Sequence, residues 1–213
     1  MALTRRVFVT RVHVDTYRRK AGIGNGFVDA YNHHVGTRLE TSRLIVRSYE
    51  PRDAAAWVAL VSDPEVRRFL PPGPVPTLGD FPGALERRRA REASSGFAMW
   101  AVDLKEDQGF VGQCGLNLIE GTDSEVELAY HFDRASWGNG YATEAGRAVL
   151  AHGFDQVALD RVIAVVVPEN VASWRVLEKI GMRYEGLATY YEMDGLKKYV
   201  AEPGWWTAGH VKV

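Results

Sequence analysis

Hydrophobic positions change their spacing along the chain in a way that predicts strands and helices in turn after residue 38. Short apolar runs indicate strands, whereas apolar positions three or four residues apart indicate helices with one buried face. Gly, Pro, Asn and Asp separate these segments and predict turns. We expect strands at 43–48, 97–104, 110–119, 126–132, 161–167, 183–192 and 197–201, and helices at 51–61, 63–70, 78–93, 141–157 and 171–180.

The order of these elements predicts an α/β protein of the α+β kind, with a mixed sheet. The segments at 97–104 and 110–119 are spaced like an antiparallel hairpin with a longer loop. The strand at 126–132, the helix at 141–157 and the strand at 161–167 form a unit whose two strands should be parallel. Asp194-Gly195 is expected to be the turn of the last hairpin.

Composition excludes several classes of protein. The 213 residues are 46% hydrophobic and carry a net charge of -1, so the chain can build a core and has no overall charge that would draw it to nucleic acid or to a membrane. We find no apolar run of membrane-spanning length and no secretory h-region, and we expect a cytoplasmic location. The single cysteine, Cys114, is expected to be a buried inert thiol rather than a nucleophile.

Residues 1–38 differ from the rest and are expected to be a basic, loosely ordered extension before a domain at 39–213. Alternation around Val12 and Val14 hints at one strand. The glycine-rich stretch 22–26 favours a flexible connection over a phosphate loop, because it lacks a preceding apolar strand and a following helix. His33-His34 lacks partners at ligand spacing, and we expect no metal centre. The triplet 87–89 (RRR) favours a solvated helix face over an anion contact.

The segment Trp137-Gly138-Asn139-Gly140-Tyr141-Ala142 lies between a predicted strand and a predicted helix. Glycines permit positive φ angles, and N–H groups at a helix N-terminus can bind a pyrophosphate. Gly138 and Gly140 can also serve only a tight strand-to-helix turn, and spacing alone does not decide between these interpretations. A dinucleotide-binding fold is disfavoured, because three antiparallel-type strands precede the loop.

The surrounding stretch 126–145 (VELAYHFDRASWGNGYATEA) resembles motif A of the GNAT superfamily of N-acetyltransferases. Trp137, Gly140 and Ala142 stand at its fixed positions, with Trp137 in place of the usual Gln or Arg. The stretches 39–47 (LETSRLIVR), 168–182 (PENVASWRVLEKIGM) and 191–195 (YEMDG) are similar to other segments of the branch that includes the ribosomal-protein N-terminal acetyltransferases. The resemblance covers about residues 39–200.

This resemblance implies a mixed, mostly antiparallel sheet of about seven strands with helices on both faces. The sheet would splay open between the strands ending at Phe132 and Val167, and acetyl-CoA would enter there. The pantetheine arm would pair with the backbone of 130–132, and the pyrophosphate would bind N–H groups of 137–142. Asn170 would bind the pantetheine, cap the following helix, or do both. The implied cofactor-binding residues are Tyr130, His131, Phe132, Trp137, Gly138, Asn139, Gly140, Tyr141, Ala142, Thr143, Asn170 and Ser173.

An amine must lose a proton to attack a thioester, and only about a tenth of an α-amine is neutral at pH 7. Glu127 is the candidate base, although it can instead bind backbone or position substrate. Family members often place a Tyr seven residues after the Asn, where this chain has Leu177. Ser173 is the candidate acid for the leaving thiolate, or it simply packs in its helix. The transfer would be direct, without a covalent enzyme intermediate.

The acceptor is expected to be a primary amine, either a protein N-terminus or a small molecule, with 69–76 and 190–193 edging its pocket. Trp205 and Trp206 would line that pocket or, as we favour, cap the core. A catalytically inactive acyl-CoA sensor is the alternative function, supported by Leu177 and by Pro203, which interrupts the C-terminal strand. Either a monomer or a homodimer is compatible with the sequence.

Overall fold

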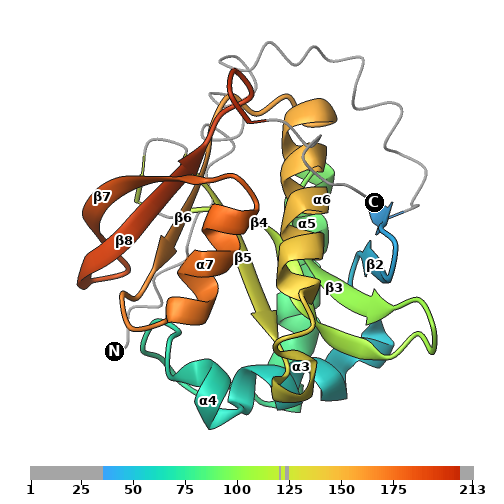
Figure 1. Ribbon diagram of the computed structural model, residues 1–213. Coiled ribbons are helices and arrows are strands. Elements are labelled where there is room, and N and C mark those ends of the chain that lie inside the picture. The colour runs from blue at the N-terminus through green and yellow to red at the C-terminus, as the bar shows by residue number, and fades with distance from the viewer. Residues whose placement is uncertain (1–35, 120, 123–124, 207–213) are drawn as a thin grey trace, which may run out of the picture. The chain divides into compact units, whose positions relative to one another are not determined.

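The computed structural model describes residues 36–119, 121–122 and 125–206. Within them, one mostly antiparallel sheet has the strand order β1-β2-β3-β4-β5-β6-β8-β7 (Figure 1). The strands are β1 Arg38–Glu40, β2 Leu44–Arg47, β3 Met99–Leu104, β4 Phe110–Leu118, β5 Val126–Phe132, β6 Val162–Val166, β7 Arg183–Tyr190 and β8 Met193–Ala201. The predicted fold class is therefore confirmed, with β1 as one strand more than expected. The features predicted at Val12, Val14, 22–26 and His33-His34 lie outside the described residues.

Helices begin where the sequence offers caps. The Asp63 carboxylate accepts a hydrogen bond from the Glu65 N–H at 2.8 Å, and Thr77 and Asp80 form a reciprocal capping box. Gly96, at φ 76°, ends α5. The α-helices are α3 Ala54–Ser62, α4 Pro64–Arg67, α5 Phe81–Ser95, α6 Tyr141–Asp155 and α7 Val171–Lys179, and the short 3₁₀ helices are η1 Pro51–Asp53, η2 Leu78–Asp80 and η3 Arg134–Ser136.

Helices α5 and α6 run along opposite faces of the sheet, so its central strands are buried on both sides (Figure 1). Trp100 and Leu116 of β3 and β4 are fully buried. Helix α6 packs against β5 and against the end of α7 at Gly146, where an added Cβ would lie 3.9 Å from the Leu128 side chain and 3.3 Å from that of Ile180. No described helix is long and apolar enough to cross a membrane.

Strands β5 and β6 are the one parallel pair among the described strands, and they separate almost at once. Their register consists of the single pair Glu127 and Ile163. By contrast, β5 pairs with β4 along its whole length, from Val126 to Phe132, and β6 pairs with β8 throughout. The edges of β5 beyond Glu127 and of β6 beyond Ile163 therefore lack each other as partners, and a gap opens in the middle of the sheet.

The last hairpin turns at a different place from the one predicted. Strand β8 begins at Met193, which pairs with Tyr190, and the two turn residues are Tyr191 and Glu192. The prediction at Asp194-Gly195 was wrong because its glycine serves another purpose. Gly195 has a φ of 73° within β8, where the register shifts by one residue and forms a β-bulge.

Three other expectations concern packing. Cys114 is fully buried, and burial raises the pKa of its thiol above the usual range, as an inert thiol requires. Trp206 is buried against Gly181 and Phe154, whereas neither it nor Trp205 lines the central cavity. The solvated face predicted for 87–89 is wrong for Arg88, whose guanidinium lies 4.6 Å from the ring centre of Tyr49 and 5.2 Å from that of Trp57.

Candidate active site

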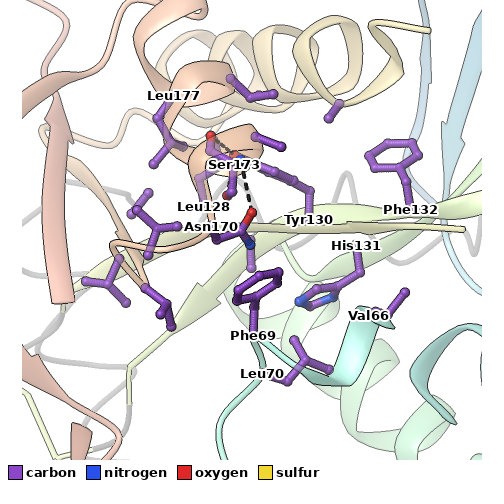
Figure 2. A pocket seen from close by; sticks show the side chains of 18 of the residues that line it. Val66, Phe69, Leu70, Leu128, Tyr130, His131, Phe132, Asn170, Ser173 and Leu177 are labelled. Atoms are coloured by element: carbon purple, nitrogen blue, oxygen red, sulfur yellow. Dashed lines mark hydrogen bonds between the residues drawn. The ribbon is translucent and has the colours of Figure 1, made fainter. Parts of the chain in front are cut away.

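A cavity of about 650 Å³ lies where β5 and β6 separate. It is lined by most of β5, the end of β6, the loop before α6 with the first residues of that helix, α7, and the segment around α4. The turn between β7 and β8 closes one end through Tyr191 and Met193. Figure 2 shows the side chains of β5 alternating across this space, with Tyr130 directed towards α7 and His131 towards Val66 and Leu70 near α4.

The loop before α6 has the backbone that its glycines permit. Gly138 and Gly140 have φ angles of 79° and 80°, and the first hydrogen bond at the start of α6 runs from the Glu144 N–H to the Gly140 carbonyl at 3.0 Å. The N–H groups of Tyr141, Ala142 and Thr143 belong to the first turn, which has no intrahelical acceptors. This end of the cavity therefore offers backbone donors and the positive end of a helix dipole, which suit an anion.

The side chain of Trp137 braces this loop. Its indole N–H donates to the Phe132 carbonyl at 2.8 Å, and 48% of the residue is exposed. Asn139 donates to the carbonyls of Ser136 and Trp137 at 3.2 and 3.3 Å and does not line the cavity. These two side chains therefore shape the loop through its own carbonyls.

Arg43 and Glu144 tie the same loop to β2, and sequence reasoning missed them. The Glu144 carboxylate accepts hydrogen bonds from the Arg43 N–H at 2.8 Å, the Arg43 Nε at 2.8 Å and the Thr41 hydroxyl at 2.6 Å. Arg43 also donates to the Asn139 carbonyl at 3.0 Å and stacks on the Tyr141 ring at 4.7 Å. The position of Glu144 in the first turn of α6 was the available signal. Its partner Arg43 could not be inferred, because it lies about a hundred residues earlier.

Glu127 lies at the point where the strands separate. Only 7% of the residue is exposed, and it lines the cavity. Burial raises the pKa of Glu127 to about 7, against hydrogen bonds from the Tyr191 hydroxyl and the Val165 N–H, which favour the carboxylate. A carboxyl group with such a pKa can gain and lose a proton near neutral pH, as a general base must.

His131 is held by a chain of buried polar side chains. The Tyr49 hydroxyl donates to Gln113 Oε1 at 2.9 Å, and Gln113 Nε2 lies 2.8 Å from His131 Nδ1. Burial, together with the charge of Arg88, lowers the pKa of His131 to about 4, so the imidazole is neutral at pH 7. With Nδ1 accepting from the amide, Nε2 carries the proton and is a potential donor.

The start of α7 brings three predicted groups together. The Asn170 side chain caps the helix by accepting from the Ser173 N–H at 3.2 Å, and it also faces the cavity. The Tyr130 hydroxyl lies 3.0 Å from Ser173 Oγ and donates to the Ser173 carbonyl at 2.8 Å (Figure 2). Burial raises the pKa of Tyr130 above its usual range, so the phenol keeps its proton. Leu177 is buried beside them and supplies no polar group.

The structure gathers nearly all of the predicted site residues around one cavity. Glu127, Ser173 and every predicted cofactor-binding residue except Asn139 line it. Of the segments predicted to edge the acceptor pocket, Phe69, Leu70, Pro71, Tyr191 and Met193 line it, whereas residues 72–76, Tyr190 and Glu192 do not. The catalytic and cofactor roles of these residues stay predictions.

This fold, with a helix N-terminus and a buried carboxyl group at a splayed strand pair, defines a class of acyl-transferring enzymes. The model of the acetyltransferase (GNAT) domain family matches residues 43–183, and the chain belongs to that family. It is an acetyltransferase, and several of its relatives are named N-acetyltransferases.

Relatives and solved structures agree with this assignment. The chain is 36% identical over 160 residues to the uncharacterized protein YkkB of Bacillus subtilis, covering 70% of this chain and 86% of the relative. It is 30% identical over 154 residues to the uncharacterized N-acetyltransferase p20 of Bacillus licheniformis, covering 72% and 86%. Among solved structures, RimJ of Mycobacterium smegmatis, in complex with CoA-disulfide, superposes with a TM-score of 0.68 at 27% identity, covering 82% of this chain and 91% of RimJ.

Proposed function

We propose that this enzyme moves the acetyl group of acetyl-CoA to a primary amine, either a protein α-amine or a small-molecule amine. The observation that carries the proposal is the buried Glu127, which faces the cavity where β5 and β6 separate and has a pKa near 7. A neutral amine is needed for attack on a thioester, and a base with this pKa can take the amine proton at neutral pH.

The cavity suits acetyl-CoA along its length. The N–H groups at the start of α6 would bind the pyrophosphate, and the unpaired edge of β5 at 130–132 would pair with the amide groups of the pantetheine arm. The Asn170 side chain borders the same path. RimJ of Mycobacterium smegmatis, which shares this fold at 27% identity, is described as a complex with CoA-disulfide, and that supports the assignment.

The reaction is a direct transfer. The amine nitrogen attacks the thioester carbonyl carbon, Glu127 takes the amine proton, and the C–S bond then breaks to release the CoA thiolate. Ser173 Oγ, whose hydrogen-bond partner is the Tyr130 hydroxyl, is the donor that protonates the thiolate; it then regains a proton from solvent, and Glu127 releases to solvent the proton that it took. A backbone N–H on the unpaired edge of β5 or β6 stabilises the negative charge that develops on the carbonyl oxygen.

Thiol release from acetyl-CoA tests the proposal, with pooled small amines and N-terminal peptides as acceptors. The wild-type enzyme should release CoA with one acceptor class. Glu127→Gln keeps the shape of the side chain but cannot take a proton, and kcat/KM should fall by about a hundredfold or more. Binding of acetyl-CoA to both proteins, measured by calorimetry, serves as the control that the cavity is intact.

Two results would contradict the proposal. If acetyl-CoA binds but no amine yields free thiol, the chain acts as an acyl-CoA sensor, an alternative that Leu177 keeps open because it supplies no acid. If acetyl-CoA does not bind, the role assigned to the loop before α6 is wrong.

A further inference from the structure

The turn between β7 and β8 reaches two carboxyl groups of the neighbouring sheet region. The Tyr190 hydroxyl donates to Glu125 Oε2 at 2.7 Å, and the Tyr191 hydroxyl donates to Glu127 Oε2. The two tyrosines are adjacent in sequence, whereas the two carboxylates are two positions apart, with Glu125 just before β5 and Glu127 within it. Only Tyr191 lines the cavity, so the two hydrogen bonds form a matched pair of which one belongs to the site.

The backbone at this turn is unusual for its residues. Tyr191 and Glu192 have φ angles of 55° and 59°, the left-handed conformation that a two-residue hairpin turn requires and that Asn-Gly or Gly-Gly adopts without strain. A tyrosine is disfavoured there, because its Cβ crowds the backbone. A bulky residue held in such a conformation at the mouth of a cavity indicates that its side chain is needed there.

We propose that Tyr191 is a positioning residue, which holds the Glu127 side chain facing the cavity and favours its ionised, proton-accepting form. This inference rests on the role of Glu127 as the base in the proposed function. Tyr191 acts through Glu127 and need not contact the acetyl group. The hydrogen bond spans 64 positions of sequence, from the strand before the pyrophosphate loop to the last hairpin.

The direction of the effect follows from which partner holds the proton. Burial and the neighbouring Glu127 carboxylate raise the pKa of Tyr191 well above its usual range, so the phenol stays protonated and is the donor. A donor stabilises a carboxylate more than a neutral carboxyl group. Tyr191 therefore lowers the pKa of Glu127 relative to what burial alone would produce, as does the N–H of Val165.

Other charged groups lie near the cavity but are not among the causes of the pKa shift of Glu127. Glu65 of α4 and Arg175 and Lys179 of α7 line the cavity. Glu125 is paired with Lys198 of β8 at 2.8 Å as well as with Tyr190. Among the described residues, burial raises the pKa of Glu127, and hydrogen bonds from the Tyr191 hydroxyl and the Val165 N–H lower it. Tyr191 is the one side chain among these three causes.

The test is Tyr191→Phe, which removes the hydroxyl and keeps the ring. The acidic limb of the kcat/KM profile for the amine acceptor should move up by about one pH unit, the size expected when a carboxylate loses one donor. Activity should fall about tenfold at pH values below the limb and recover above it. Titration of carbon-13-labelled glutamate carboxyl groups by NMR, with Glu127→Gln to identify the signal, should show the same shift without any acceptor present.

Tyr190→Phe is the matched control, because it removes the same hydroxyl from the adjacent residue, the last of β7, and affects Glu125 instead. It should change neither the position of the acidic limb of the kcat/KM profile nor the pKa of Glu127 measured by NMR. The inference is overturned if Tyr191→Phe leaves the Glu127 titration unchanged, or if Tyr190→Phe moves it equally. Since NMR reports the carboxyl group directly, a protein that titrates as expected but transfers no acetyl group would refute the proposed function alone.

Discussion

At the scale of single residues, the contact between Tyr130 and Ser173 allows a test of the proposal that Ser173 protonates the leaving thiolate. Ser173→Ala removes a hydroxyl from a residue that lines the cavity, while the Tyr130 hydroxyl keeps its bond to the Ser173 carbonyl at 2.8 Å. A CoA thiol can leave as the thiolate, so we expect kcat to fall only about tenfold, which is less than the hundredfold or more that is typical of a lost general acid. Steady-state kinetics with saturating acetyl-CoA checks this.

Tyr130→Phe distinguishes the contribution of the Tyr130 hydroxyl to kcat from that of the Ser173 hydroxyl. If Tyr130 only orients Ser173, its removal should cost less than Ser173→Ala, and the double variant should resemble Ser173→Ala alone. An unchanged kcat in Ser173→Ala would exclude Ser173 as the acid, and the hydroxyl would then serve only to bind Tyr130.

The residues that sequence reasoning identified lie in short stretches that resemble the family. Glu127 is on the strand before the loop, where related enzymes often carry a Glu, and Ser173 is three residues after Asn170, where the resembling branch has a hydroxyl. Tyr191 and the chain from Tyr49 to His131 could not be found in this way. Their partners lie 64 and more positions away or in other strands, and hydrophobic periodicity carries no information about such pairs.

At the scale of elements, the start of α6 is held by the carboxylate of Glu144. Glu144→Gln keeps the shape but weakens the charge-assisted bonds to Arg43 and Thr41. The loop Trp137–Gly140 would then be less well ordered before the ligand arrives, so KM for acetyl-CoA should rise about threefold to tenfold, with little change in kcat. Initial-rate kinetics at varied acetyl-CoA measures this.

Glu86→Gln on the exposed side of α5 is the control for the loss of one negative charge, because Glu86 does not line the cavity. Equal changes in KM for the two variants would contradict the role of Glu144 in holding the loop, and would point to a general charge effect on an anionic ligand instead.

Elements were predicted well in type and less well at their turns. The strands and helices on either side of the loop before α6 follow from periodicity, and Gly138 and Gly140 do adopt positive φ angles. In the last hairpin the glycine signal gave a wrong turn at Asp194-Gly195, because a glycine in a β-bulge and a glycine in a turn look alike in the sequence. The gap between β5 and β6 was expected from family resemblance, since no pattern in either strand indicates where pairing stops.

At the scale of the whole molecule, a buried cluster of charges joins the first part of the domain to the sheet that carries the site. The Arg47 guanidinium of β2 donates to Asp103 of β3 at 2.6 Å and to both oxygens of Asp53 in η1 at 2.8 Å. All three residues are buried. Arg47→Met would fill similar space and leave two buried carboxylates without their cation, so we expect unfolding free energy to fall by about 3 to 5 kcal/mol.

Arg161→Met is the matched control, because Arg161 also pairs with two carboxylates, Glu185 and Glu202, but its side chain is 39% exposed. Solvent screens that pair, and we expect a loss of no more than about 1 kcal/mol. Denaturant unfolding followed by circular dichroism compares the two. Similar losses would contradict the view that burial makes the Arg47 cluster special.

The pH dependence of the Arg47→Met protein provides a second, independent check. Without the guanidinium, burial and mutual repulsion would raise the pKa values of Asp53 and Asp103 above those of the unfolded chain. The folded state then binds more protons than the unfolded state in that range, so stability falls as pH rises through the raised values. Relative to wild type, the variant should therefore recover stability between pH 7 and pH 5. A deficit that is equal at both pH values would mean that lost packing, rather than two unpaired carboxylates, destabilises the domain.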